Sequence, residues 1–531
     1  MILNKKFKSD YIFYLVILIF SISVNQYYGF FAVNPLDNFT IYHSGNLILN
    51  GQKPFEDYWV TTGLTLDIIQ YLFFKFFGTS WSSYILHASV INTLYSLLIF
   101  IVLRSFKLKK FYCLFYSILS AILFYPVVGT PFVDHHSIFF SISSILVFFL
   151  AIKKEDNQIY WFFIPVLLFF GFLSKQTPAT YVLIIVFFSS LFYSINNKKF
   201  KILFIYLLSS LTILILFFIL LKINKINFIN FYTQYISFPS TIGSERAGVD
   251  GFLKPFSFSR YFIKFKYIHL VSIPIIISMI TLCKEKSSFL KSKDFLIMLN
   301  VLLLSYITII HQLLTLNSKF NYFIIPLIAG FSHIFITKYD IKFSKHFVKY
   351  ILFIVVISST YYGYKYVHNR GFLVINDLYN KDKIFKTNII DKSNLKFNWL
   401  THYNTSPEKE VEILEKTANL LKKIDNNSKE KYLLITDYQF ISHKYDLKNA
   451  VTINKLYGSG ISYPSNDNKY FRSYRDFFIK KLKKFNISNI YFIIPSYFNE
   501  QDKSLKGIFD KDCKKKTQKL NLIEINIDDC F

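Results

Sequence analysis

The stretch FKILFIYLLSSLTILILFFILL, residues 200–221, sets the class of this protein. It carries no charged residue after Lys201, and its apolar side chains lie on all sides of a helix rather than along one stripe. A helix rises about 1.5 Å per residue, so a run of this length crosses the roughly 30 Å hydrocarbon core of a membrane. Because each peptide group in lipid needs a partner within its own segment, the run must be helical.

Further runs of the same kind bring the total to about eleven within the first 363 residues. Hydrophobic residues make up 53% of the 531 residues, and the mean hydropathy is +0.34. A soluble chain of this length would instead divide into several domains with polar surfaces. The sequence therefore predicts an all-α polytopic membrane domain over residues 1–363. The runs lie near 10–31, 81–103, 111–128, 135–152, 158–173, 177–195, 200–221, 267–283, 295–316, 320–337 and 347–363.

Basic residues mark every second connection, beginning with Lys5, Lys6 and Lys8 before the first run. Cytoplasmic loops carry the excess of lysine and arginine, so we expect a cytoplasmic N-terminus and an extracytoplasmic chain from about residue 364. The membrane is expected to be the bacterial inner membrane. No small-residue cleavage site follows the first run, which favours a retained helix over a removed signal peptide. The other inner bases are Arg104, Lys107, Lys109, Lys110, Lys153, Lys154, Lys198, Lys199, Lys201, Lys284, Lys286, Lys291, Lys293, Lys338, Lys342, Lys345 and Lys349.

The formal net charge of +28 has this placement as one source and the lysine excess of an AT-rich genome as another. The bases gather at the ends of apolar runs and do not form a solvent-facing patch interleaved with aromatic residues. The charge pattern thus indicates a membrane-lipid environment and no nucleic-acid partner.

Two outer loops are long, at residues 32–80 and 223–266, and long loops between spans tend to be functional. Within the first loop, residues 38–50 and 64–77 show apolar residues at helical spacing. We expect two amphipathic helices in the plane of the membrane interface, the second with an apolar face of Ile68, Ile69, Leu72, Phe73 and Phe76. The alternative for the second is a helix in a soluble core.

The segment 364–531 alternates helical and strand-like patterns and predicts a soluble α/β domain outside the membrane. The residues 407–424 follow a helix-start signal at Ser406-Pro407, and short strands are predicted at 432–436, 490–494 and 520–527. Cys513 and Cys530 both lie here, and they either form a disulfide, as suits an oxidising compartment, or stay unpaired.

Several catalytic signatures are absent, including a phosphate-binding loop, HExxH, paired CxxC and GxSxG. Acidic residues sit at outer helix ends and in outer loops, so any chemistry is expected at the external surface. One such group is Asp134-His135-His136 at the start of a run, where Asp134 either helps to shape a substrate site or only favours the helix N-terminus. Adjacent histidines point about 100° apart on a helix and do not readily chelate one metal, so we assign no metal.

The densest group of polar residues is NPLDN (34–38), YHSG (42–45) and NGQKPFEDYW (50–59). It resembles the first extracytoplasmic loop of the GT-C glycosyltransferases, which use polyprenyl- or dolichyl-phosphate sugars and include protein mannosyltransferases and aminoarabinose transferases. The resemblance covers the first 340 residues in layout and is motif-specific over residues 35–80. The matching pieces are Asp37, Leu47 to Gly51, Pro54-Phe55-Glu56-Asp57, Gly63 to Gln70 and Phe77-Gly78.

The resemblance implies that Asp37 is the general base, while Asp37 as a mere helix cap is the alternative. A carboxylate with an ordinary pKa is ionised at neutral pH and accepts a proton from an acceptor hydroxyl. Attack on the anomeric carbon opposite the phosphate inverts its configuration. Many family members have a second acid next to the first, where this chain has Asn38, so a two-carboxylate or metal-assisted scheme is not implied.

Other residues are candidates for binding the donor or acceptor, namely Asp134, His135, Glu56, Asp57, Lys175, Arg246 and Lys319. The three bases would receive the lipid phosphate, whose developing charge needs cations or N–H donors. Their alternatives are a lysine snorkelling at a helix end for Lys175 and a surface ion pair for Arg246. No cofactor beyond the lipid-linked sugar is expected.

The function that this resemblance implies is an inverting transfer of a sugar from a polyprenyl-phosphate carrier to a lipid, glycan or protein acceptor at the outer membrane face. The alternatives are a flippase for a lipid-linked glycan and a polysaccharide polymerase. A flippase needs a polar central path, of which the apolar runs show little. Loss of sugar transfer in Asp37→Asn with retained lipid binding would favour the glycosyltransferase over the flippase and the polymerase.

Overall fold

The computed structural model describes residues 10–31, 33, 38–60, 62–154, 157–246, 258–315, 321–341, 343–370, 384–400, 406–453, 460–493, 505–509, 515–517 and 522–530. The chain folds as two compact units. We call the first, Met1–Gly29, Ile85–Ile219 and Arg246–Asn376, the helical unit. The second, Phe30–Tyr84, Leu220–Glu245 and Asp377–Phe531, is the mixed unit.

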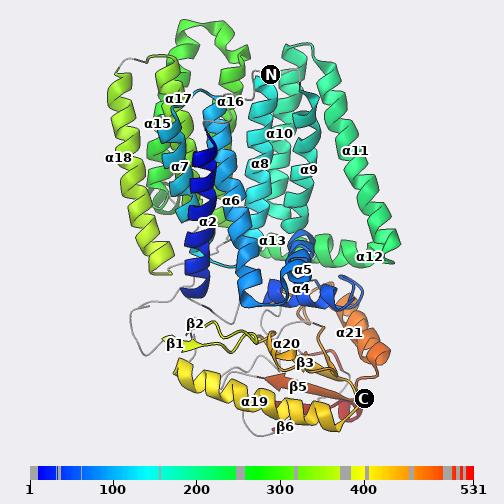
Figure 1. The fold of residues 1–531 in the computed structure, drawn as a ribbon. Helices are drawn as coiled ribbons and strands as arrows, with labels where there is room; N and C mark the ends of the chain where they lie inside the picture. The colour runs from blue at the N-terminus through cyan, green and yellow to red at the C-terminus, as the bar shows by residue number, and fades with distance from the viewer. Residues whose placement is uncertain are drawn as a thin grey trace. The chain divides into compact units, whose positions relative to one another are not determined.

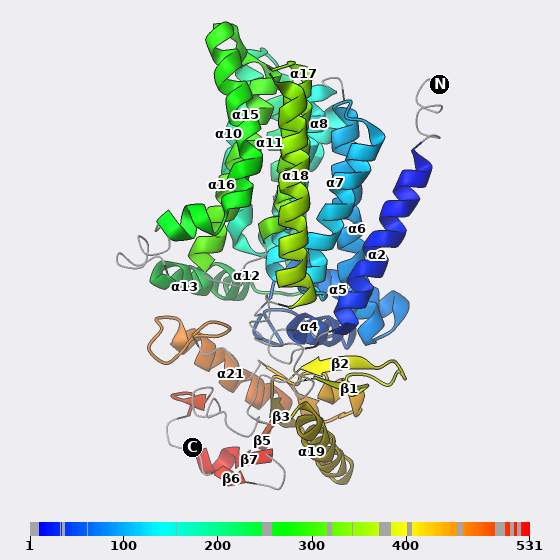
Figure 2. The ribbon, with the colours of Figure 1, turned by 90° about the vertical axis from the view of Figure 1, so that its left-hand side faces the viewer.

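Long helices that run side by side make up the helical unit (Figures 1 and 2). At its centre α8 is buried at almost every position, and it packs against α9 and α10. A second group consists of α15, α17 and α18, of which α17 also packs against α7. The main helices are α2 (Tyr11–Phe31), α6 (Trp81–Ser105), α7 (Lys110–Leu123), α8 (Val133–Lys153), α9 (Gln158–Ser174), α10 (Gln176–Asn196), α11 (Phe200–Ile223), α15 (Lys266–Glu285), α16 (Lys293–Thr315), α17 (Ile325–Lys338) and α18 (Ser344–Tyr362).

Within the described residues, nine helices are long and apolar enough to cross a membrane. The two remaining predicted runs are also helical but shorter: α9 has 17 residues, and α17 has 14 after a 3-10 turn at Asn321–Ile324. Helix α17 is buried at almost every position, so neighbouring helices cover most of its surface. These helices are those of an integral membrane protein, and the predicted fold class of a polytopic helical domain with a C-terminal α/β domain is confirmed.

A buried arginine fixes one end of the helical unit. The guanidinium of Arg370 donates hydrogen bonds to the carbonyl oxygens of Pro126, at 2.5 Å, Val127, at 3.2 Å, and Tyr28. Its side chain is fully buried. Because a forked, always-charged donor can serve several carbonyls at once, this one residue satisfies backbone groups from α2 and from the turn Tyr125–Val127.

The mixed unit contains a five-stranded sheet in the order β4-β3-β5-β7-β6. Strand β3 pairs in parallel with β4 and β5, whereas β7 is antiparallel to both β5 and β6. A separate antiparallel pair is formed by β1 and β2. The strands are β1 (Ile384–Thr387), β2 (Phe397–Leu400), β3 (Tyr432–Ile435), β4 (Ala450–Val451), β5 (Asn489–Ile493), β6 (Lys515–Thr517) and β7 (Leu522–Asn526).

Helices α19 (Pro407–Asn427), α20 (Ile441–Lys444) and α21 (Phe471–Phe485) accompany this sheet. The Ser406 side chain caps α19 by accepting a hydrogen bond from the Lys409 backbone N–H, as the start signal predicts. The predicted strands are confirmed as β3, β5 and β7 with shifts of one or two residues at their ends. Cys530 is disulfide-bonded, and its predicted partner Cys513 lies outside the described residues.

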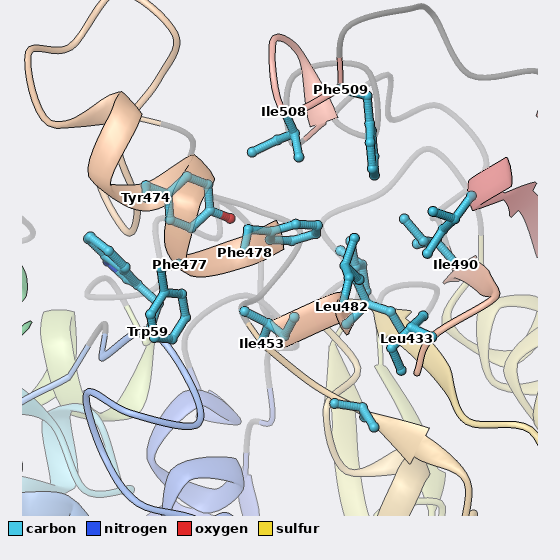
Figure 3. Close-up of a cluster of buried hydrophobic side chains, with 14 of the residues drawn as sticks. Trp59, Leu433, Ile453, Tyr474, Phe477, Phe478, Leu482, Ile490, Ile508 and Phe509 are labelled. Atoms are coloured by element: carbon cyan, nitrogen blue, oxygen red, sulfur yellow. The ribbon is translucent and has the colours of Figure 1, made fainter. Parts of the chain in front are cut away.

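Segments of both long loops belong to the mixed unit. The first loop forms α4 (Thr40–Leu49) and α5 (Leu64–Phe77), and the second forms α12 (Phe228–Phe231), a π-helical stretch at Tyr232–Ser237 and α13 (Phe238–Arg246). Trp59 of the first loop packs edge-on against Phe238, Tyr474 and Phe477. It thereby joins the apolar core of the C-terminal domain, where Figure 3 shows it beside α21.

Close packing of α4 on α5 follows from Gly45. A Cβ at this position would come within 2.6 Å of the Gln70 side chain of α5. The buried side of α5 carries Asp67 and Gln70, both fully buried, beside the apolar Leu66 and Phe74. The predicted apolar face points the other way: Ile68, Leu72 and Phe76 are exposed, Phe76 by 73%.

Candidate functional site

Three helix ends in the helical unit converge on the carboxylate of Asp134, in the first turn of α8. The Lys175 Nζ lies 2.7 Å and the His311 Nε2 2.9 Å from the same oxygen, Oδ1. Lys175 occupies the junction between α9 and α10, and its carbonyl oxygen accepts a 2.9 Å hydrogen bond from the Ser137 hydroxyl. Asp134 and His311 are 1% exposed, while Lys175 is 22% exposed.

The second oxygen of Asp134 gives this cluster its chemical interest. Oδ2 is buried and has no hydrogen-bond partner among the described residues. A buried carboxylate oxygen without a hydrogen bond costs free energy, so Oδ2 is suited to accept a hydrogen bond from an N–H or O–H group of a ligand. An ammonium has three N–H donors, and Asp134 occupies one of those of Lys175. The cluster thus offers one acceptor and one partly exposed cation side by side.

Two neighbouring histidines have structural partners. His135 packs among the rings of Phe124, Tyr125 and Phe132. His136 contacts His87 through their Nε2 atoms at 2.7 Å and contacts the Tyr125 hydroxyl through Nδ1. The structure therefore places His135 in an aromatic cluster, and its predicted role in substrate binding stays a prediction. No group of three residues that could hold a metal occurs in the part of the chain that the structure describes.

Glu56 and Asp57 hold segments of the mixed unit together. The Glu56 Oε1 accepts hydrogen bonds of 2.8 Å from the Asn227 backbone N–H and from the Asn230 side chain, at the start of α12. The Asp57 Oδ1 lies 2.5 Å from the Lys484 Nζ and 3.3 Å from the Lys481 Nζ of α21. Both carboxylates are thus occupied by the chain itself.

The electrostatics of Asp57 follow from these contacts. Burial raises its pKa, but the hydrogen bonds from Lys484 and from the Lys53 backbone N–H, together with the charges of Lys481 and Lys484, outweigh burial. The net result is a pKa below the ordinary value of the group. Asp57 is therefore ionised at neutral pH and serves as the counter-ion of α21.

A further acid, Asp67 of α5, is fully buried without a cationic partner among the described residues. The Ser44 and Thr62 hydroxyls donate to its Oδ1 at 2.5 and 2.6 Å, and Oδ2 has no hydrogen-bond partner within the same residues. Burial raises the pKa of Asp67 to about 7, against the lowering effect of the two hydroxyls. Such a perturbed carboxyl inside a fold is a candidate for a functional role.

The side chains of three predicted site residues are not described in the structure. Asp37 and Lys319 lie outside the described residues, and Arg246 ends α13 but only its backbone is described. Conversely, sequence reasoning missed His311 and Asp67. Each had a signal: His311 is an ionisable residue inside the apolar run 295–316, and Asp67 interrupts the apolar series Leu64 to Ile69. Ionisable groups in such surroundings are costly and are functional candidates by default.

No family model and no curated protein matches this chain. Among solved structures, the chain is similar to the apo form of the oligosaccharyltransferase from Archaeoglobus fulgidus. The two share 12% sequence identity with a TM-score of 0.48, and the match covers 90% of this chain and 69% of that chain. The proposed function therefore rests on the residues of this chain.

Proposed function

We propose that this protein is an inverting membrane glycosyltransferase. It transfers a sugar from a polyprenyl-phosphate carrier to a lipid, glycan or protein acceptor at the outer face of the membrane. The observation that carries the proposal is the pairing of Asp134 with Lys175 and His311, because it assembles an anion-binding cation and a free carboxylate oxygen where three membrane helices end.

The reaction needs three roles. An acceptor hydroxyl attacks the anomeric carbon, its proton passes to the carboxylate of Asp37, and the bond from carbon to phosphate oxygen breaks with its electrons on the phosphate. Lys175, with N–H donors beyond the one that Asp134 occupies, stabilises the charge that develops on the departing polyprenyl phosphate. The free Oδ2 of Asp134 accepts a hydrogen bond from a hydroxyl of the donor sugar and thereby orients the ring.

Membrane sidedness supports the same reaction. Nucleotide sugars are made in the cytoplasm, so an external transferase needs a donor that has already been carried across. The placement of basic residues in the sequence predicts a cytoplasmic N-terminus, and with it an extracytoplasmic position for Asp37, Asp134 and Lys175. This topology is tested by labelling single introduced cysteines from either side of the membrane. If a cysteine near residue 37 reacts only from the cytoplasmic side, the proposed function is refuted.

The activity is tested in two stages. The lipid-linked sugar that accumulates in cells without the protein is identified by mass spectrometry, and this lipid is then given to the purified protein in liposomes. We expect Asp37→Asn to reduce transfer by roughly a hundredfold or more, as for loss of a general base. We expect Asp134→Asn and Lys175→Met each to reduce transfer, and the double variant to lose little more than the worse single variant, because the two residues act as a unit.

A matched control is Asp294→Asn. Asp294 lies in the first turn of α16, where its carboxylate accepts hydrogen bonds from Lys338 and from the Tyr339 hydroxyl. It repeats the Asp–Lys pairing of the cluster at a helix end predicted to be cytoplasmic. Its replacement should leave transfer unchanged. Unchanged transfer in both Asp37→Asn and Asp134→Asn would refute the enzyme assignment, and glycolipid translocation without a new glycosidic bond would support a flippase instead.

A further inference from the structure

The mixed unit contains a small cavity, lined by both apolar and polar groups, that the proposed reaction does not use. Its walls come from α4, from the segment after Pro54 and from the C-terminal domain. The cavity measures about 20 Å³, which is room for one water molecule or one hydroxyl group. The lining residues are Thr40, His43, Ser44, Leu47, Tyr58, Trp59, Thr62, Gln439, Thr452 and Ile453.

Several polar groups in this wall lack partners. Both ring nitrogens of His43, the hydroxyl of Tyr58 and the indole Nε1 of Trp59 are buried with no hydrogen-bond partner among the described residues. Each of the three side chains is at most 5% exposed. Folded proteins rarely leave so many buried donors and acceptors unsatisfied, so the cavity is suited to a ligand that supplies the missing bonds.

Asp67 sets the polarity of one side of the cavity. Ser44 and Thr62 line the cavity, and the hydroxyls of both donate to the Asp67 Oδ1; the Ser44 hydroxyl lies 2.5 Å from this oxygen and 3.2 Å from its other acceptor, the Ile41 carbonyl oxygen. Their oxygens are thereby left as hydrogen-bond acceptors toward the cavity, because a hydroxyl has one proton and two lone pairs. Asp67 is a positioning residue here, since it acts through the two hydroxyls.

The chemistry of the walls selects the ligand. Among the described residues no lysine or arginine lines the cavity, and burial lowers the pKa of His43 to about 4, so none of these residues carries a positive charge to compensate a phosphate or carboxylate. The lining includes acceptors at Ser44 and Thr62 and donors at Tyr58 and Trp59, and a neutral hydroxyl both donates and accepts. The volume admits one such group and leaves the rest of its molecule at the mouth.

The geometry points to a subsite that binds one hydroxyl-bearing corner of a neutral sugar between α4 and the C-terminal domain, with Ser44 and Thr62 as acceptors. It rests on the proposed function only for the identity of the ligand as a sugar, and it gives the C-terminal domain a role in holding that sugar.

Binding is measured without transfer, so that the two proposals fail separately. The probes are methyl glucoside, methyl mannoside, methyl galactoside and N-acetylglucosamine, with glucosamine as a cationic comparison. Saturation-transfer NMR on the full-length protein in detergent should detect at least one neutral probe. Ser44→Ala and Thr62→Val should each weaken that binding about fivefold, as expected for one neutral hydrogen bond.

The control is Thr417→Val in α19, which removes a buried hydroxyl that donates to the Ile413 carbonyl; neither residue belongs to the cavity lining. This variant should bind like the wild type. The subsite is refuted if no neutral probe binds, if only glucosamine binds, or if Ser44→Ala and Thr62→Val bind as well as Thr417→Val. Each of these results leaves the transfer assay unaffected.

Discussion

The ion pair between the first loop and α21 gives the most quantitative prediction. The Lys481 side chain is 4% and that of Asp57 10% exposed, so both charges of this pair are buried. In Asp57→Ala, Lys481 becomes a buried charge without its counter-ion, which costs about 3–5 kcal/mol. Lys484 is 52% exposed, and solvent limits its share to about 1 kcal/mol or less. The expected loss is therefore dominated by Lys481.

The assay is hydrogen exchange of the α21 backbone amides, followed by mass spectrometry on the full-length protein. The exchange rate rises exponentially with the lost free energy of local opening, by a factor of ten for about every 1.4 kcal/mol. A loss of about 3–5 kcal/mol should therefore make α21 exchange about two to four orders of magnitude faster in Asp57→Ala. The double variant Asp57→Ala/Lys481→Met should recover most of this loss, because it removes the stranded charge.

Asp446→Ala is the matched control, since Asp446 pairs with Lys392 at 2.6 Å but both side chains are more than half exposed. Its effect should stay below about 1 kcal/mol. Less than tenfold faster exchange in Asp57→Ala, or no recovery with Lys481→Met, would refute the reasoning and return Asp57 to its predicted role in the substrate site.

Three further predictions follow from single residues. Arg370→Lys should lower the thermal stability of the purified protein almost as much as Arg370→Leu, by about 3 kcal/mol, because two separate guanidinium nitrogens serve the three carbonyls and a single ammonium nitrogen cannot reach them all; equal stability of Arg370→Lys and the wild type would contradict this. The folded protein keeps Asp67 protonated up to about pH 7 and the unfolded chain only to about pH 4, so stability should fall by a few kcal/mol as pH rises between these values and then level off. Unfolding measured from pH 4 to 8 should show this slope in the wild type and not in Asp67→Asn, with the buried hydroxyls of Tyr58 and Tyr235 staying neutral throughout. Ser406→Ala should destabilise α19 by about 1 kcal/mol through loss of its cap, detected as faster exchange in its first turn, and an unchanged first turn would argue against the cap.

The positions of individual helices could be predicted from the sequence because they depend on residues that are close together in the chain. The periodicity of residues 64–77 predicted α5 with the bounds that the structure shows, and Ser406-Pro407 predicted the start of α19. Both signals depend on neighbours a few residues away, where helix geometry and capping act. The signals of the apolar runs are equally local, and over the residues that the structure describes each run is largely helical.

The partners of the predicted site residues needed long-range information. Lys175 lies 41 positions and His311 lies 177 positions from Asp134 along the chain. No periodicity in the sequence reports contacts over such separations. Glu56 and Asp57 matched a motif, yet their contacts with Asn227 and Lys484 depend on how α12 and α21 pack in the mixed unit. A motif can predict which residues matter and still leave open whether they hold a ligand or the fold.

Helix α5 shows how the two kinds of information combine. Its pattern predicted an apolar face, but a pattern cannot say whether that face meets a protein core or lipid. In the structure the buried side carries Asp67 and Gln70 beside Leu66 and Phe74, while Ile68, Leu72 and Phe76 are exposed, so α5 has apolar side chains on both sides, unlike a helix on a soluble core. Exposed apolar side chains at every fourth position on one helix are unfavourable in water and favourable in the interface of a membrane. We therefore expect α5 to lie in that interface, so that the lipid covering its outer face helps keep water away from the buried carboxyl of Asp67.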